Sequence, residues 1–137
     1  MLVRNVMQRK VKTVDHLVRV LEVVEIMNRE RIGSVIVLYD EKPVGIITKR
    51  DLLTKCLAEC INPCDMIAED ILAEPLITIS PDETIDKCLF ILLEKGISKL
   101  PVMENGELVG IVSAKDILIA LGIGKKASKG ELEVERQ

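Results

Sequence analysis

The chain has 137 residues, of which 48% are hydrophobic and 1% are aromatic, and its formal net charge is −3. No apolar run approaches the roughly 20 residues that a membrane-spanning helix needs, and the N-terminus lacks the apolar core of a signal peptide, so we expect a soluble, cytoplasmic protein. The scarcity of aromatic residues argues against single-stranded nucleic acid as a ligand, because proteins that bind it stack bases on aromatic side chains.

The first half of the chain predicts, in order, a strand, a helix, a hairpin and a closing helix. Apolar residues at helical spacing indicate the first helix, and two β-branched runs on either side of turn-forming residues indicate the hairpin. Pro63, in the segment that follows, stops the closing helix. These elements are expected at residues 11–14, 17–29, 34–39 with 44–48, and 49–59.

The second half predicts the same order of elements. Residues 80–83 form a candidate capping box with Pro81 at the first helical position, which indicates a helix start. Asn105-Gly106 favours a tight type I′ turn in the hairpin. The elements are expected at residues 76–79, 81–95, 100–103 with 108–113, and 114–121, followed by a flexible charged tail at 124–137.

The two halves are copies of each other. The stretch GIITKRD at 45–51 aligns without a gap with GIVSAKD at 110–116, and the same offset pairs Thr13 with Thr78. A repeat of this length indicates a duplicated β-α-β-β-α unit. We place the copies at 1–61 and 62–123, and because each is small we expect them to share one core or to lean on each other.

A tandem β-α-β-β-α unit in which each copy ends in Gly-apolar-apolar-Thr/Ser-x-x-Asp resembles the CBS domain, named after cystathionine β-synthase. The second copy adds GISKLPV at 96–102, which is typical of the family. The resemblance covers about residues 3–121. It implies an α/β (α+β) fold of two CBS repeats related by a pseudo-two-fold axis, a Bateman module. It also implies sensing rather than catalysis, with an adenosine-containing ligand such as AMP, ADP, ATP or S-adenosylmethionine in a cleft between the repeats.

The chemistry of the repeated motif suits such a ligand. Thr48 and Ser113 stand where a strand runs into a helix, so their hydroxyls and the free N–H groups of the first helical turn can hold a phosphate oxygen. Asp51 and Asp116 follow one turn later, and a carboxylate can accept hydrogen bonds from the two adjacent hydroxyls of a ribose. We therefore expect these four residues to contact the ligand.

Five further residues complete the expected set of ligand contacts. Arg50 and Lys115 directly precede the aspartates and can add positive charge near phosphates. Lys99 occupies a position where the family often places a basic residue directed at ligand phosphates. The small strand-end residues Thr13 and Thr78 are expected to line a slot for adenine.

The same motif has a purely structural explanation. Thr-x-x-Asp and Ser-x-x-Asp are also capping boxes, in which the hydroxyl accepts a backbone N–H and the carboxylate bonds back to the cap; capping and binding are compatible. The two copies differ, because Ser34 stands at the position of Lys99. We therefore expect the corner with Ser113 and Asp116 to be the better phosphate site, and the corner of the first repeat to be empty or to prefer a less anionic ligand.

The remaining reactive side chains match no standard site. Cys56, Cys60 and Cys64 are spaced by four residues, which leaves open a metal site, a disulfide such as Cys60 to Cys64, or small buried residues; we favour the last and predict no metal. We expect Cys88 to lie in a helix core. His16, the only histidine, is expected to be exposed at a helix start.

These features predict that the protein is not an enzyme, because the sequence shows no nucleophile with a base, no paired carboxylates and no glycine-rich phosphate loop. The expected function is a stand-alone regulatory module that binds an adenine nucleotide, AMP or ATP by preference, needs no cofactor, and signals to a separate effector protein. The alternative is a ligand-independent scaffold. In both cases we expect a homodimer through helical faces that carry Leu52, Leu53, Leu118 and Ile119, with neither nucleic acid nor membrane as a partner.

Overall fold

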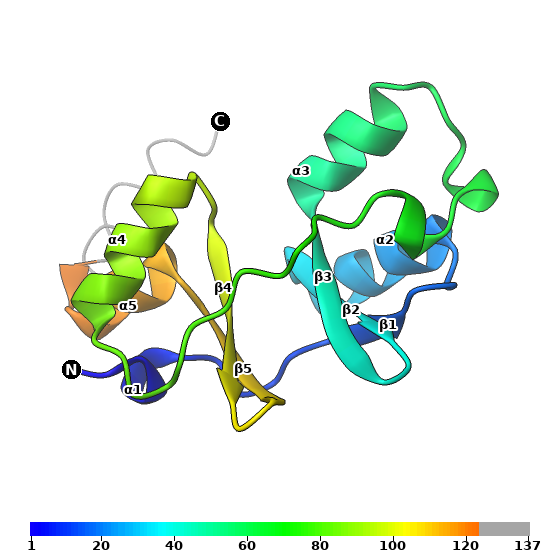
Figure 1. Cartoon of the computed structure of the whole chain (residues 1–137). Coiled ribbons are helices and arrows are strands. Elements are labelled where there is room, and N and C mark those ends of the chain that lie inside the picture. The colour runs from blue at the N-terminus through cyan, green and yellow to red at the C-terminus, as the bar shows by residue number, and fades with distance from the viewer. Residues whose placement is uncertain (124–137) are drawn as a thin grey trace, which may run out of the picture. The chain divides into compact units, whose positions relative to one another are not determined.

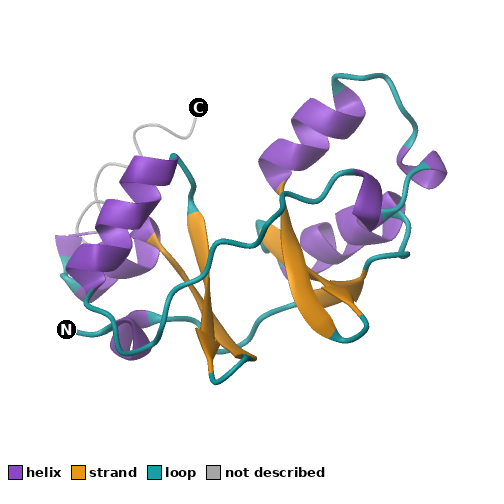
Figure 2. Ribbon diagram, viewed as in Figure 1, coloured by secondary structure: helices purple, strands orange, loops and turns teal. Residues whose placement is uncertain are grey.

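The computed structural model describes residues 1–123, and the tail predicted at 124–137 lies outside them. The chain divides into two compact units that cross the repeat boundaries of the sequence. Unit 1 joins Met1–Lys10 to the residues from Thr78 onward, and unit 2 is the continuous segment Val11–Ile77. Figure 1 labels their elements, and Figure 2 distinguishes helices from strands.

Unit 2 is a three-stranded sheet packed against helices. The strand order is β1-β2-β3, with β1 parallel to β2 and β2 antiparallel to β3. The parallel pair requires a crossover, which α2 provides. The elements are β1 (Thr13–Asp15), α2 (Val20–Glu30), β2 (Ser34–Tyr39), β3 (Lys42–Thr48), α3 (Lys49–Leu52), the π-helix η1 (Leu53–Leu57), and the 3₁₀ turns η2 (Pro63–Asp65) and η3 (Ala68–Asp70).

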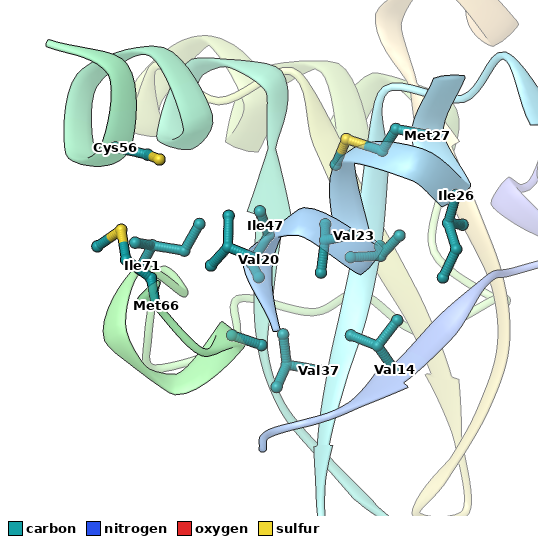
Figure 3. Close-up of a cluster of buried hydrophobic side chains, with 12 residues drawn as sticks. Val14, Val20, Val23, Ile26, Met27, Val37, Ile47, Cys56, Met66 and Ile71 are labelled. Carbon is teal, nitrogen blue, oxygen red and sulfur yellow. The ribbon is translucent and has the colours of Figure 1, made fainter. Parts of the chain in front are cut away.

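The core of unit 2 follows from the two periodicities of strand and helix. Val20, Val23 and Met27 recur at helical spacing on α2 and form its buried stripe. They pack against the sheet face on which alternate strand residues are buried, in the cluster shown in Figure 3. The sheet residues of this cluster are Val14, Val35, Val37 and Ile47.

Unit 1 has the same architecture with a smaller sheet. The antiparallel hairpin of β4 and β5 packs with α4 and α5, and the blue N-terminal segment in Figure 1 lies with these elements. The elements are α1 (Val3–Val6), α4 (Ile85–Lys95), β4 (Lys99–Glu104), β5 (Glu107–Ser113) and α5 (Ala114–Ala120). Its buried residues form a cluster separate from that of unit 2, so the first of the two alternatives expected for the repeats, a single shared core, is not what the described residues show.

The first ten residues are part of unit 1 and complete its core. Val3 has no exposed surface and Met7 is 8% exposed, and both belong to the buried cluster of this unit. Gln8 pairs with Ile111 of β5 through two backbone hydrogen bonds of 2.8 and 2.9 Å. Gly110 permits this close approach, because a Cβ at that position would lie 2.9 Å from the carbonyl oxygen of Gln8.

Unit 2 repeats this arrangement with a segment from the middle of the chain. Ala73 pairs with Ile46 of β3 through backbone hydrogen bonds of 2.8 and 3.1 Å. Gly45 lies beside this pair, and a Cβ there would be 2.8 Å from the carbonyl oxygen of Ala73. Gly45 and Gly110 are equivalent positions of the duplication, so in each unit the last strand pairs with a segment from the start of the other copy.

The helix start predicted at Ser80 is wrong. The helix α4 begins at Ile85, and its N-cap is Thr84, whose Oγ1 accepts a hydrogen bond of 3.1 Å from the N–H of Lys87. The N–H of Ile85 donates to the carbonyl of Met1 at 3.1 Å instead of to a preceding helical turn. The N-terminal segment therefore uses the backbone groups that would have extended the helix backwards.

The strand predicted at 76–79 is reduced to one residue, because only Ile79 forms a parallel bridge to β4. In unit 2 the N–H of Ile36 donates to the carbonyl of Lys12 at 2.9 Å and holds β1 against β2. Pro101 stands at the equivalent position of β4 and has no N–H to donate. The sheet of unit 1 consequently has two strands instead of three.

The hairpins and closing helices are confirmed. Asn105 and Gly106 have φ angles of 52° and 81°, the positive values that a type I′ turn requires, and they join β4 to β5. The helix expected at 49–59 is α3 continued by η1, and the helix expected at 114–121 is α5. The helix α2 begins later than residue 17, because the N–H of Val20 donates to the carbonyl of Met66 at 2.9 Å.

Candidate functional site

The junction of β5 and α5 brings together Lys99, Ser113 and Asp116, which we call the unit 1 corner. Ser113 ends β5 and caps α5, and Lys99 is its direct partner on β4. The backbone N–H and the hydroxyl of Ser113 both donate to Asp116 Oδ2 at 2.9 Å. In return, the N–H of Asp116 donates to Ser113 Oγ at 3.2 Å.

The junction of β3 and α3 forms the unit 2 corner, which consists of Ser34, Thr48 and Asp51. Ser34 of β2 is the direct partner of Thr48. The backbone N–H and the hydroxyl of Thr48 donate to Asp51 Oδ2 at 2.8 and 3.1 Å, and the N–H of Asp51 donates to Thr48 Oγ1 at 3.4 Å. The two copies therefore build the same corner, except that a serine replaces the lysine.

Both aspartates close capping boxes, so the structural explanation of the motif is confirmed. Each Oδ2 already accepts two hydrogen bonds, which is about as many as one carboxylate oxygen can accept. The expected side-by-side acceptance of two ribose hydroxyls by both oxygens is therefore not available in this geometry. What remains for a ligand is the other oxygen, Oδ1.

The partner of Oδ1 differs between the corners. Asp116 Oδ1 accepts a hydrogen bond of 3.1 Å from the side-chain amide Nε2 of Gln8. Asp51 Oδ1 lies 3.2 Å from the ammonium Nζ of Lys55, which also donates to the carbonyl of Ile71 at 3.1 Å. The amide of Gln8 is neutral, whereas the ammonium of Lys55 neutralises the charge of Asp51.

Neither of these neighbours was predicted from the sequence. Lys55 follows Asp51 by four residues, and that helical spacing is a usable signal for an ion pair. Gln8 gave no such signal, because it reaches Asp116 only through the pairing of the N-terminal segment with β5.

The other predicted contacts lie around the corners without direct bonds to the aspartates. Arg50 and Lys115 are exposed in the first turn of α3 and of α5. Thr13 is exposed at the start of β1, with β2 between it and the strand of Thr48. Thr78 is exposed and precedes the single bridge at Ile79, so it does not lie on a strand.

All four cysteines lie within the described residues and are free, so the structure holds no disulfide between Cys60 and Cys64. Cys56 and Cys88 are buried, as expected of small core residues, whereas Cys60 and Cys64 are exposed, contrary to the prediction that they are buried. Burial raises the pKa of the Cys88 thiol to about 11, and the charge of Asp116 adds to this effect. Within residues 1–123, no group of three or more histidine, cysteine or acidic side chains is placed to hold a metal ion.

The prediction of an exposed His16 is wrong. Its side chain is 17% exposed, and Nδ1 lies 2.7 Å from Glu69 Oε1. Its ring packs against Tyr39 with the centroids 4.4 Å apart. His16 therefore has a structural role between β1 and α2, where its backbone N–H also donates to Leu38.

Sequence comparison adds an independent observation to this geometry. The profile of the CBS domain matches the chain twice, at residues 3–58 and 68–123. The chain belongs to the CBS domain family. Two CBS domains in tandem form a CBS pair, which is a regulatory module. No helix within residues 1–123 combines the length and apolar character needed to cross a membrane.

The relatives of this CBS pair include an uncharacterized protein and an enzyme. An uncharacterized protein of Methanopyrus kandleri is 37% identical over 118 residues, which are 85% of this chain and 60% of that protein. Inosine-5′-monophosphate dehydrogenase of Thermoplasma acidophilum is 35% identical over 94 residues, which are 68% of this chain but 18% of the enzyme. The chain thus spans less than two thirds of either relative, and the match to the enzyme covers only its CBS part.

A solved structure shows the same fold with ligands bound. It is a CBS domain pair in complex with 5′-methylthioadenosine and S-adenosyl-L-methionine. It matches with a TM-score of 0.78 at 28% identity, and the match covers 89% of this chain and 96% of that one.

Proposed function

We propose that this CBS pair is a sensor that binds an adenosine-containing ligand at its strand-to-helix corners and signals to a separate partner protein. The observation that carries the proposal is the unit 1 corner, where Lys99 is the direct strand partner of Ser113 and Ser113 holds the carboxylate of Asp116. A hydroxyl and an acid are joined there, and the strand pairing places a lysine opposite the serine. The similar CBS pair that holds two adenosyl compounds supports the same ligand class.

Individual groups of the unit 1 corner suit particular parts of the ligand. Asp116 Oδ1 has one acceptor position beside the bond from Gln8, and it accepts a ribose hydroxyl. Lys99 and the exposed Lys115 supply positive charge for phosphate oxygens. These cations favour AMP, ADP or ATP over an adenosyl ligand without phosphate in unit 1.

Isothermal titration calorimetry with the full chain tests the proposal. AMP, ATP, S-adenosylmethionine and 5′-methylthioadenosine are titrated into the wild type and into Asp116→Asn, which keeps a side-chain oxygen for the cap. A hydrogen bond to a charged group is worth about 1.5–3 kcal/mol, so we expect the variant to bind roughly ten- to a hundredfold more weakly.

The matched control is Asp86→Asn, which removes an exposed carboxylate from the first turn of α4 and is expected to bind like the wild type. Wild-type protein that binds none of the four compounds, or an Asp116→Asn variant that binds as tightly as the wild type, would contradict the proposal.

A ligand-driven signal requires that the ligand favour one arrangement of the module over another. The partner that reads this change is a separate protein in our proposal. A dose-dependent rise of the melting temperature with AMP or ATP is expected, since a ligand that binds only the folded state stabilises it.

One observation favours a second candidate function, that of an interaction scaffold. Phe90 and Leu93 of α4 are 62% and 75% exposed, whereas Glu25 and Asn28 occupy the equivalent positions of α2. Among the described helices α2 and α4, only α4 thus presents large apolar side chains there, which suits a homodimer contact. Sedimentation velocity of Phe90→Glu, which copies the residue of the first repeat, is expected to show a monomer where the wild type is a dimer. A wild type that is monomeric throughout would remove this candidate.

A further inference from the structure

The duplication provides an internal comparison of the two corners. Ala120 stands at the position of Lys55, and Ala73 stands at the position of Gln8. The partner of each aspartate is thus absent from the other copy. A residue that accompanies one corner and not the other can make the corners bind differently while the capping geometry stays the same.

Lys55 contacts two groups at the unit 2 corner. Its ammonium lies 3.2 Å from Asp51 Oδ1 and donates to the Ile71 carbonyl at 3.1 Å, so it is tied to both. The side chain of Asp51 is only 12% exposed, whereas that of Lys55 is 43% exposed and remains partly hydrated. The acid is therefore enclosed, with its free oxygen already paired to a cation.

Gln8 supplies no charge that would compensate that of Asp116. Its amide donates one neutral hydrogen bond of 3.1 Å to Oδ1 and brings no positive charge. Hydrogen bonds to an ionised acceptor are roughly twice as strong as neutral ones. A ribose hydroxyl that donates to Asp116 gains this strength, whereas one that donates to Asp51 must share the acceptor with an ammonium.

We infer that Lys55 competes with the ligand for the carboxylate of Asp51, so that an adenosyl ligand fills the unit 1 corner first. The inference rests on the proposed function of the corners and adds to it the residues that rank them. Lys55 acts through Asp51 and is a specificity-determining residue of the unit 2 corner. Gln8, through its neutral contact, is a positioning residue of the unit 1 corner.

The test uses 5′-methylthioadenosine, whose lack of phosphate removes any direct attraction to lysine. Titrations compare Asp116→Asn with the double variant Asp116→Asn/Lys55→Gln, in which unit 2 receives the neutral amide that unit 1 has. We expect about fivefold tighter binding in the double variant, the factor that corresponds to a partly exposed ion pair worth ~1 kcal/mol. Lys42→Gln in the same background is the charge control, since Lys42 is exposed at the opposite end of β3 from Thr48.

The reciprocal variant is Ala120→Lys in the wild-type background. Ala120 is exposed at the end of α5 and follows Asp116 by one helical turn, so the substitution places an ammonium where Lys55 stands in unit 2. We expect about fivefold weaker binding of 5′-methylthioadenosine, with an unchanged melting temperature of the ligand-free protein.

The two possible failures are distinguishable. If the wild type binds the ligand but Lys55→Gln gives no tighter binding in the Asp116→Asn background, Lys55 is not a competitor and the inference is overturned. The same holds if Ala120→Lys leaves binding unchanged. If neither the wild type nor any variant binds, the proposed function itself fails and this inference fails with it.

Discussion

Replacing Gly110 with alanine is expected to loosen the N-terminal segment from unit 1. A Cβ at this position would lie 2.7 Å from Met7 Sδ and 2.9 Å from the carbonyl oxygen of Gln8. The methionine side chain can rotate away. The Gln8 carbonyl cannot move without stretching its 2.9 Å hydrogen bond from the N–H of Ile111.

The magnitude follows from two opposing effects. Adding a methyl group to a well-packed site costs about 1–3 kcal/mol. The same change restricts the unfolded chain and returns about 0.4–1 kcal/mol. We therefore expect Gly110→Ala to lower the free energy of unfolding by about 1–2 kcal/mol.

Urea unfolding gives the free energy, and amide hydrogen exchange gives the location of the change. The N–H groups of Gln8 and Ile111 are expected to exchange faster in Gly110→Ala, while the N–H of Ala73, which makes the equivalent bond in unit 2, keeps its wild-type rate. A variant whose free energy of unfolding lies within about 0.5 kcal/mol of the wild type, with Ile111 as protected as before, would contradict this prediction.

Two further predictions concern α4. Thr84→Ala is expected to lower the free energy of unfolding by about 1 kcal/mol because it removes the N-cap, whereas Ser80→Ala is expected to change it by less than about 0.5 kcal/mol; equal effects in urea unfolding would contradict the assignment of the cap. The pKa of Cys88 is raised from 9.0 to about 11, so the folded state holds this proton more tightly than the unfolded chain does. The resulting stability is complete below pH 9 and is lost as the pH rises through 11. The wild type should therefore lose more stability than Cys88→Ala over that interval, and parallel pH profiles would exclude the effect.

Local signals in the sequence predicted the parts of the fold that depend on near neighbours. The Asn105-Gly106 turn and the capping boxes at Thr48 and Ser113 came out as expected, because each depends on residues within one or two turns. The duplication added the equivalence of the two corners, which no single copy would have established.

The errors lie where a distant segment takes over backbone groups. Ser80 is of a residue type that often caps helices, but the helix starts later because the N–H of Ile85 donates to the carbonyl of Met1. The strand before α4 is lost because Pro101 cannot donate the hydrogen bond that Ile36 makes in the first copy. Neither effect is visible in a window of neighbouring residues.

In the candidate site, too, contacts between near neighbours were predicted better than contacts with distant segments. The sequence placed Ser113 and Asp116 together correctly and ranked the corners by Lys99 alone. The partners of the free carboxylate oxygens were missed, although Lys55 lies one helical turn from Asp51. Gln8 is separated from Asp116 by most of the chain and becomes its neighbour only in the folded unit.

Because the two compact units cross the boundaries of the sequence repeats, their residues are translated in an order that affects when each unit can fold. Unit 2 is the continuous segment Val11–Ile77, so all of its residues have been translated before α4 begins. Unit 1 needs Met1–Lys10, which are translated before unit 2, together with β5, which is translated after it. Met1–Lys10 therefore lack their partner strand until unit 2 and β4 have been translated, and pairing them with β5 costs the entropy of closing a long loop. Unit 1, which contains the corner expected to bind ligand first, can thus be completed only after all of unit 2 has been translated.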